Sequence, residues 1–376
     1  MANTNLSKAK NAKNDEFYTQ YHDIATEVEA YLEYNPNVFQ GKTVLCPCDD
    51  PYESNFFKYF ALRFKPLGLK KLIATCYAGS PIANRQLCLF DEESAENKTT
   101  KSPHKIEITE IPDMNNDGAV NLIDVELLLA SDRNHLTRLK DDGDFRSEEV
   151  TKLRDEADII VTNPPFSLFR EFLAWIVEAD KQFLIIGNMN AITYKEVFPL
   201  IKENKMWLGN RFNKRVNGEN MTFLVPDNYP MAGTETYIDK DGKKFIAVAG
   251  TGWFTNLDHG KRHQPLPLTS MAENLRYSKH KEIRGKVSYD RYDNYDAIEV
   301  PYTDAIPGDY DGVMGVPVSF LDKYSPEQFE IIGATESEGR GFSNGLWKES
   351  SAISQALVNG EKVYKRLFIK HRKAAV

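Results

Sequence analysis

Apolar runs of strand length alternate with helix-like segments through the first half of the chain, and this alternation limits the fold more than any other feature. The strand-like runs end at polar, glycine or proline positions, and the segments between them place apolar residues at helical spacing. Strands separated by helices of this length pair in parallel through right-handed crossovers. The pattern predicts an α/β fold with a doubly wound, Rossmann-like sheet, whose ligands bind beyond the carboxyl ends of the strands. We expect strands within 41–51, 70–79, 105–111, 157–166 and 181–188, and helices over 54–64, 147–157 and 167–180.

The second half of the chain changes character from about residue 205 onward. Short β-like runs, many tyrosines and frequent Gly, Pro and Asn residues replace the alternation of strands and helices. We therefore expect a flexible tail over 1–14, an α/β domain over 15–204 and a mixed, β-rich region over 205–376.

Charge and composition limit the functional classes. The 376-residue chain has a net charge of −8, which argues against indiscriminate coating of nucleic acid. The acidic excess lies in the first 200 residues, so a nucleic-acid-binding face is expected in the second half. No apolar run approaches the roughly 20 residues that span a bilayer, and the polar N-terminus lacks the apolar core of a secretory signal. We expect a cytoplasmic protein without membrane contact.

The four cysteines, Cys46, Cys48, Cys76 and Cys88, lie in the first quarter of the chain. In the cytoplasm they are expected to be reduced thiols packed near strands. Cys46 and Cys48 lack the paired CxxC spacing of a zinc site, so the sequence does not favour zinc there.

A strongly apolar strand ends in Asn163-Pro164-Pro165-Phe166, where the predicted fold places its chemistry. The prolines fix φ and remove two backbone donors, which leaves the Asn163 side-chain oxygen and the Pro164 carbonyl as rigid acceptors. Two such acceptors suit an exocyclic amino group, and Phe166 can stack on the ring that carries it. The motif favours methyl transfer from S-adenosylmethionine to the amino group of an extruded base, through positioning and electrostatics.

The tetrapeptide alone is also compatible with a purely structural role and with a different substrate. A strand followed by a proline turn, with Phe166 in the core, requires no function. A methyltransferase acting on a protein amide can also use such a loop, commonly with Tyr in the fourth position.

Seven stretches of the sequence, one of which contains this tetrapeptide, point to a family. Through them the chain resembles the EcoRI-type family of adenine-specific DNA methyltransferases over nearly its whole length. The stretches are NDEFYTQ (14–20), VLCPCDDPYESNFFKYF (44–60), LGLKKLIATCY (67–77), DGDF (142–145), IVTNPPFSLFREF (160–172), FLIIGNMNAITYKE (183–196) and GVPVSFLDKYSPEQFEIIG (315–333).

The resemblance implies a site-specific enzyme that methylates N6 of a flipped-out adenine in duplex DNA, in restriction-modification or a related DNA-marking system. Residues 15–204 would then bind S-adenosylmethionine and catalyse, and residues 205–376 would recognise the DNA target. It further implies a monomeric bacterial or phage-encoded enzyme. A cognate restriction endonuclease is not visible in the sequence.

The resemblance also assigns the cofactor contacts. The loop after the first strand lacks the usual Gly-x-Gly and offers carboxylate and amide groups instead, while Asp144 would accept from the cofactor's adenine and Phe145 would pack on its ring. From the residues alone, these segments also fit ordinary turns and a helix cap. No acidic residue follows the second strand, so the ribose ligand is not assigned. The implied contacts are Phe17, Tyr18, Thr19, Cys48, Asp49, Asp50, Ser54, Asn55, Asp144, Phe145 and Asn163.

Residues 113–124 follow the pattern of a calcium-binding loop. Asp113, Asn115, Asp117 and Asp124 stand at positions 1, 3, 5 and 12, with Gly118 at the sharp turn. The alternative is a metal-free polar turn before a helix. Methyl transfer requires no metal, so a bound Ca²⁺ here would be structural.

Basic residues with interleaved aromatics occur in the second half, although most charge runs are simply solvated faces. Given a DNA substrate, the segment 261–286 is the best candidate for phosphate and base contacts. The candidate residues are Arg211, Lys214, Arg215, Lys261, Arg262, Arg276, Lys279, Lys281 and Arg284.

Two further functional hypotheses compete with DNA methylation: a methyltransferase for RNA adenine or a protein amide, and a non-catalytic DNA- or calcium-binding relative. The basic, aromatic second half favours DNA over a protein substrate. The glycine-free first loop favours lost catalysis.

Overall fold

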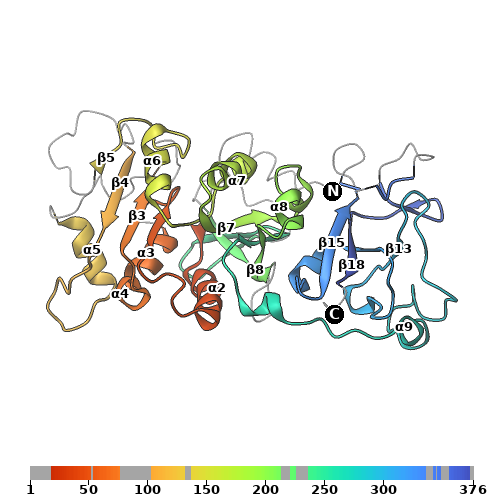
Figure 1. Ribbon diagram of the computed structural model, residues 1–376. Helices are drawn as coiled ribbons and strands as arrows, with labels where there is room; N and C mark the ends of the chain where they lie inside the picture. Colours follow the sequence, from red (N-terminus) through yellow and green to blue (C-terminus); the bar gives the residue numbers. More distant parts are fainter. Residues whose placement is uncertain are drawn as a thin grey trace. The chain divides into compact units, whose positions relative to one another are not determined.

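The computed structural model of the protein divides into two compact units (Figure 1). The first comprises the described parts of Met1–Asn188 and Arg211–Asp258, and the second those of Met189–Asn210 and His259–Val376. The structure describes residues 18–51, 54–76, 103–131, 137–212, 221–225, 236–335, 342–343, 345–348 and 355–372.

A sheet with the strand order β5-β4-β3-β2-β6-β7-β12 organises the first unit, and β8, the next strand in this order, has only Arg211 and Phe212 in that unit. The four neighbours β3, β2, β6 and β7 are mutually parallel, as the sequence predicts. The strands are β2 (Thr43–Cys46), β3 (Lys71–Thr75), β4 (His104–Ile108), β5 (Thr137–Arg138), β6 (Ile159–Thr162), β7 (Gln182–Asn188), β8 (Trp207–Phe212) and β12 (Thr251–Thr255).

The expectation of an all-parallel sheet is wrong at its margins. Strand β4 runs antiparallel to β3, and β12 runs antiparallel to β7. The sequence carries the reason for β4, because its alternating buried and half-buried residues are typical of an antiparallel strand near a sheet edge. Parallel strands buried on both faces read instead as continuous apolar runs, as β2 and β6 do.

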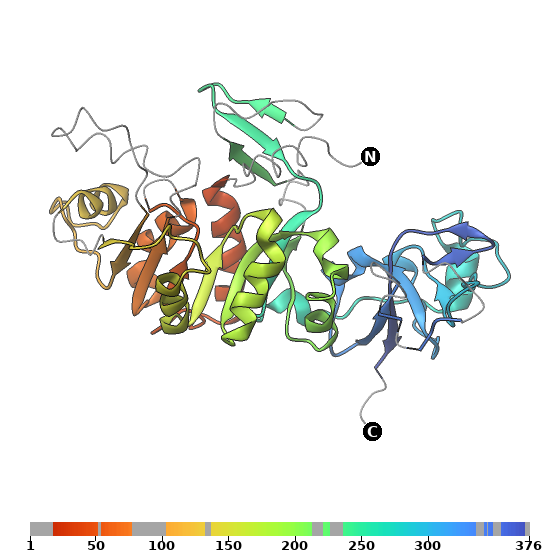
Figure 2. The ribbon, with the colours of Figure 1, turned by 90° about the horizontal axis from the view of Figure 1, so that it is seen from above.

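Helices cover both faces of this sheet (Figure 2). On one face, Val44, Leu72, Ile159 and Trp253 join a core with the helices α2 and α3, where Phe56 contacts Trp253 edge to face. On the other face, Phe254 packs against Phe169 of α7. The helices of this unit are α2 (Tyr21–Tyr34), α3 (Asn55–Leu62), α4 (Phe64–Leu67), α5 (Leu122–Ala130), α6 (Glu148–Glu156) and α7 (Phe169–Glu178).

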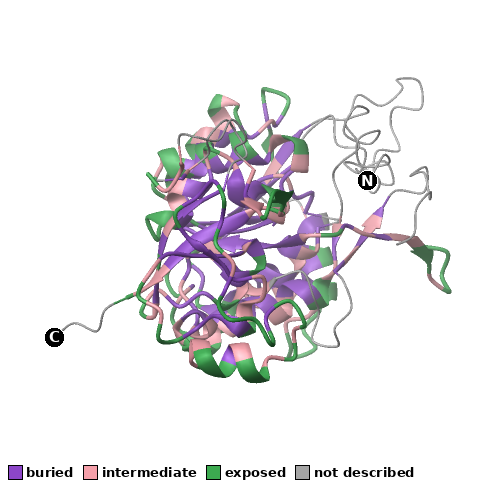
Figure 3. Ribbon diagram, turned by 90° about the vertical axis from the view of Figure 1, so that its right-hand side faces the viewer, coloured by how far each residue is buried: buried purple, intermediate pink, exposed green. Residues whose placement is uncertain are grey.

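A smaller antiparallel sheet, in the order β1-β9-β11-β10, belongs to the same unit. Its strands are β1 (Tyr18–Thr19), β9 (Thr222–Val225), β10 (Thr236–Ile238) and β11 (Lys244–Ala247). Strand β9 is anchored in the main core by Phe223, whereas the turn between β10 and β11 is exposed (Figure 3). The compact units therefore do not follow the expected division at residue 204, because β9, β11 and β12 pair with strands of the first unit.

The second unit is built on the mixed sheet β13-β14-β18-β15. Its core contains Tyr292, Tyr295 and Phe368, and it encloses an ion pair in which Arg366 Nη2 lies 2.6 Å from Glu299 Oε1. The elements are α8 (Phe198–Lys202), α9 (Met271–Tyr277), β13 (Ile298–Glu299), β14 (Met314–Pro317), β15 (Phe329–Ala334), β16 (Leu357–Val358), β17 (Glu361–Lys362) and β18 (Arg366–His371). Over the described residues of both units, no helix has the length and apolar character needed to cross a membrane.

Close packing around Gly187 of β7 gives a direct test of the sheet–helix interface. A Cβ at this position would lie 2.4 Å from Phe169 and 2.9 Å from Phe254. We expect Gly187→Ala to lower the free energy of unfolding by about 1–3 kcal/mol, measured by urea denaturation. The control Gly242→Ala, at φ +80° with open space around it, should cost about 1–2 kcal/mol from backbone strain alone and leave α7 packing unchanged. Wild-type stability of Gly187→Ala would contradict the packing described.

Candidate active site

The carboxylate of Asp49 joins three elements at the carboxyl ends of the parallel strands. It accepts hydrogen bonds from Ser54 Oγ (2.5 Å), ahead of α3, and from Thr162 Oγ1 (2.6 Å), the last residue of β6. Asp49 is only 7 % exposed. These two hydroxyl bonds fix the orientation of the carboxylate, which can accept several hydrogen bonds.

The loop that carries Asp49 adopts a glycine-like backbone without containing a glycine. Cys48 has φ 135°, in the region that glycine occupies readily and other residues rarely. The amides of Cys48 and Asp49 both donate to the Thr75 carbonyl, at 3.4 and 3.0 Å, which fixes the loop against the end of β3. Cys48 thus takes a backbone conformation that glycine favours in a loop that contains no glycine, and strain of this kind is typical of functional loops.

The first turn of α3 and the strand β1 meet beside this loop. Ser54 caps α3 by accepting from the amides of Phe56 (3.1 Å) and Phe57 (3.4 Å), so the positive end of the helix points at the loop. Asn55 Nδ2 donates to the Thr19 carbonyl at 2.8 Å. The predicted residues Asp49, Ser54 and Asn55 are thus brought together, with Thr19 against them.

Thr19 is 4 % exposed, and no hydrogen-bond partner for its hydroxyl lies among the described residues. A buried hydroxyl normally has a partner, because burying it alone is costly. Its neighbour Tyr18 pairs with Leu224 in β9, and Thr19 pairs with Phe223. Phe17 lies outside the described residues. The Thr19 hydroxyl is therefore a fitting contact for a polar ligand beside Asn55.

The Asn163-Pro164-Pro165-Phe166 segment directly follows Thr162 in the chain, and Thr162 binds the Asp49 carboxylate, so the segment begins beside Asp49 in space. Both prolines are buried and Asn163 is half-buried. The Pro165 carbonyl accepts from Leu168 N (2.9 Å), which opens the short 3₁₀ helix at Phe166–Leu168. Phe166 is half-buried and meets Phe223 edge to face, with ring centroids 6.5 Å apart. Because Phe223 is the partner of Thr19, the tetrapeptide and β1 border one region.

The loop at 142–145 is placed against the end of β3. Gly143, at φ 78°, allows this approach, because a Cβ there would lie 2.4 Å from the Cys76 carbonyl oxygen. Burial alone would raise the pKa of Asp144, but the hydrogen bonds and charge of Arg146 (Nη2 to Oδ2, 2.7 Å) hold it below its usual value. Sequence reasoning did not single out Arg146 as the partner of Asp144, although Arg146 directly follows the predicted motif.

Phe145 is 4 % exposed and packs edge to face on Phe172 and Trp175 of α7. Its ring thus contributes to the core between the loop and the helix. The predicted packing of Phe145 on a bound adenine stays a prediction.

A structural calcium ion, one of the two alternatives for residues 113–124, is not supported. Both oxygens of Asp124 accept backbone hydrogen bonds, from Met114 and Asn115 at Oδ1 and from Asn121 at Oδ2, and Asp124 completes the capping box of α5. Asp113 and Asp117 likewise accept from amides within the loop. The segment that matches the calcium-loop pattern folds as a polar turn in which the position-12 carboxylate serves the helix cap.

The basic residues predicted to contact DNA lie in different environments. Lys261 binds Asp322 (2.6 Å) and the Asn210 carbonyl, and the buried Arg262 guanidinium stacks 3.8 Å from the Trp207 ring centroid. These two therefore hold the second unit together. Arg276, Lys279, Lys281 and Arg284 are exposed on and after α9, where Lys279 pairs with Asp304 (2.7 Å). Arg211 is half-buried in the first unit, and Lys214 and Arg215 lie outside the described residues.

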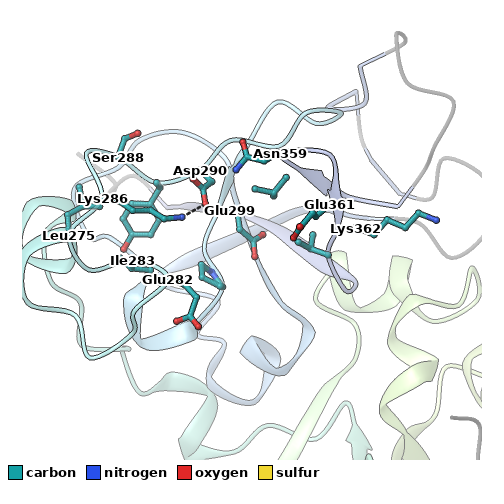
Figure 4. A pocket seen from close by; sticks show the side chains of 14 residues that line it. Leu275, Glu282, Ile283, Lys286, Ser288, Asp290, Glu299, Asn359, Glu361 and Lys362 are labelled. Atoms are coloured by element: carbon teal, nitrogen blue, oxygen red, sulfur yellow. Dashed lines mark hydrogen bonds and ion pairs between the residues drawn. The ribbon is translucent and has the colours of Figure 1, made fainter.

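A cavity of about 470 Å³ lies in the second unit, between the end of α9 and the β16–β17 hairpin (Figure 4). Its lining includes Glu282, Asp290, Glu299 and Glu361, and Lys286 is bound to Asp290. The acidic lining disfavours phosphate. The cavity contains none of the residues predicted for the cofactor or the amino group.

Comparison with known proteins identifies a family and several relatives that this chain resembles. The profile of the family described as "Adenine-specific methyltransferase EcoRI" matches residues 5–372. The Type II methyltransferase M.EcoRI of Escherichia coli is 44 % identical over 98 % of this chain and 96 % of its own length. Type II methyltransferase M.MpnI of Mycoplasma pneumoniae is 37 % identical, covering 87 % and 84 % respectively, and M.MgeORF184P of Mycoplasma genitalium is 33 % identical, covering 97 % and 98 %. No solved structure gives a significant match.

Removing either hydroxyl that holds Asp49 tests the site. We expect Thr162→Val and Ser54→Ala each to lower the free energy of unfolding by about 1–3 kcal/mol and to weaken S-adenosylmethionine binding, measured by calorimetric titration. Thr255→Val is the matched control, because Thr255 Oγ1 donates to the Phe183 carbonyl (2.7 Å) where β12 pairs with the beginning of β7. It should lose stability and keep cofactor affinity. Unchanged S-adenosylmethionine affinity in Thr162→Val and Ser54→Ala would show that Asp49 does not belong to the cofactor site.

Proposed function

This chain belongs to the EcoRI-type family of adenine-specific DNA methyltransferases, and we propose that its strand-end residues bind S-adenosylmethionine beside an extruded target adenine. The enzyme methylates adenine in DNA at specific sites, in restriction-modification. The observation that carries the proposal is the hydrogen bond from Thr162 to Asp49, because it joins the amino-group motif to the proposed cofactor loop. We further propose a Rossmann-like catalytic unit and a DNA-recognition role for the second unit.

The residues around Asp49 fit the polar end of the cofactor. The amino-acid end of the cofactor has an ammonium group, which needs acceptors, and a carboxylate, which needs donors. A protein carboxylate can accept from the ammonium, and a helix N-terminus and a buried hydroxyl can donate to the ligand's carboxylate. Asp49 supplies the acceptor, and Thr19 supplies a hydroxyl. When bound, S-adenosylmethionine supplies an electrophilic methyl group on a sulfonium.

Asn163 and Pro164 orient the amino group that accepts the methyl group. An amino nitrogen conjugated to a purine is a poor nucleophile, because its lone pair is delocalised into the ring. Two acceptors that take both N–H hydrogens draw it toward tetrahedral geometry and localise the lone pair. The prolines keep these acceptors rigid, and the half-buried Phe166 offers a surface to replace the stacking that the extruded base loses.

The family assignment bears on the competing hypotheses of a protein-amide substrate and of a relative without catalytic activity. Adenine specificity disfavours a protein-amide substrate, and the glycine-like φ of Cys48 supports a cofactor-binding loop that lacks Gly-x-Gly. The enzyme is proposed to act as a cytoplasmic monomer on duplex DNA.

Replacing Asn163 tests the amino-group role. We expect Asn163→Ala to reduce kcat by at least about 100-fold, because an oriented acceptor is lost, while cofactor affinity stays near that of the wild type. The assay uses labelled S-adenosylmethionine with duplex DNA, RNA or protein, followed by identification of the modified nucleoside. Asn256→Ala is the control, since Asn256 Oδ1 accepts from Phe183 N (2.8 Å), where β12 pairs with the beginning of β7. Label only in RNA or protein, or full activity of Asn163→Ala, would overturn the assignment.

The exposed basic residues after α9 are proposed to contact DNA phosphates. Arg284 is exposed, and no ion pair involving it occurs among the described residues. We expect Arg284→Ala to weaken duplex binding and to reduce the slope of log K against log[salt] by about one, measured by fluorescence anisotropy. Arg138→Ala, an exposed arginine of β5 in the first unit, should leave the slope unchanged. Equal slopes for wild type and Arg284→Ala would exclude Arg284 as a phosphate contact.

A further inference from the structure

Three side chains of different chemistry converge beside the proposed cofactor loop. Asp50 comes from the loop after β2, Cys76 directly follows β3, and His104 begins β4. Their ligand atoms all lie within 4.8 Å of one another, and the residues are 8 %, 2 % and 3 % exposed. Methyl transfer gives no role to Cys76 or His104, and the sequence separates these two by 28 residues.

The backbone holds this cluster in place independently of any ligand. Cys76 N donates to the His104 carbonyl (3.0 Å), and Asp49 N donates to the Thr75 carbonyl (3.0 Å). Gly143 brings the 142–145 loop against the Cys76 carbonyl. The three ligands therefore belong to elements whose relative positions are already fixed, which lowers the entropic cost of binding an ion.

The distances fit tetrahedral coordination by a small divalent cation. Zinc–sulfur and zinc–nitrogen bonds of about 2.3 and 2.0 Å, at a tetrahedral angle, place sulfur and nitrogen about 3.5 Å apart. Cys76 Sγ lies 3.6 Å from His104 Nε2 and 3.0 Å from Nδ1. The edge of the imidazole thus faces the sulfur at a separation close to that of two ligands on one ion.

We propose that Asp50, Cys76 and His104 form a zinc-type site, which binds one divalent cation through carboxylate, thiolate and imidazole and leaves a fourth position open. A thiolate with an imidazole selects a borderline-soft ion such as Zn²⁺ or Co²⁺ over Ca²⁺ or Mg²⁺, which prefer oxygen ligands. The cation would fasten the first loop to the ends of β3 and β4.

The charge environment agrees with an ion that displaces a proton. Burial and the nearby Asp50 carboxylate raise the pKa of Cys76 to about 12, although backbone hydrogen bonds oppose the rise. The metal-free cluster therefore holds a neutral thiol. Coordination replaces the S–H bond with a sulfur–metal bond and releases one proton to solvent, so binding strengthens as pH rises.

Cobalt titration of the full-length protein tests the site. Protein treated with a chelator and desalted, without cofactor or DNA, is titrated with CoCl₂ under a phosphine reductant. We expect a thiolate-to-cobalt charge-transfer band in the near ultraviolet that saturates at one equivalent, is displaced by ZnCl₂, and is accompanied by a higher Tm. Cys76→Ser and His104→Gln should lose the band and weaken Zn²⁺ binding at least about 10-fold.

Cys46→Ala is the matched control, because Cys46 is a buried thiol of β2 that belongs to the hydrophobic core. It should keep both the band and the Zn²⁺ affinity. Absence of the band in the wild type, or its persistence in Cys76→Ser, would reduce the cluster to a hydrogen-bonded thiol–imidazole pair and overturn the proposal. Since Asp50 was also predicted to contact the cofactor, omitting the cofactor keeps a failure of metal binding distinct from a failure of the proposed methyl-transfer site.

Discussion

The Asp49 carboxylate is the constraint on which the rest of the proposed site depends. It takes hydroxyl bonds from the cap of α3 and from the last residue of β6, so one group ties the first loop to the strand that carries the amino-group motif. A buried carboxylate requires such donors, because burying a charge without hydrogen-bond partners costs several kcal/mol. These hydrogen bonds compensate for the burial of the carboxylate. They also set the distance between the proposed cofactor loop and the amino-group motif after β6.

At two positions beside the site, a loop packs closely against the end of β3. Cys48 adopts a φ that glycine favours, whereas Gly143 provides the contact that a side chain would block at Cys76. Both positions lie against the end of β3, at Thr75 and Cys76. The end of this strand therefore receives two loops, and its Cys76 side chain is left facing His104.

The sequence predicted the parallel centre of the sheet because its strands are separated by helices of crossover length, and the fully buried strands β2 and β6 fit that prediction. It also predicted the tetrapeptide's position after β6. It did not reveal that Thr162 and Ser54 share one carboxylate, since Thr162 and Asp49 are 113 positions apart and leave no local pattern. Nor could spacing show that Asp124 caps α5, that Arg262 stacks on Trp207, or that β12 returns to the first unit. Contacts formed only in the folded chain decide each of these.

A crystal structure of the protein with S-adenosylhomocysteine tests the central claim most directly. The account predicts that the amino-acid end of the ligand lies within hydrogen-bond distance of Asp49 and Thr19, with its sulfur directed toward Asn163. A ligand bound elsewhere, such as the acidic cavity lined by Glu282 and Glu361, or one that leaves Asp49 without contact, would contradict it.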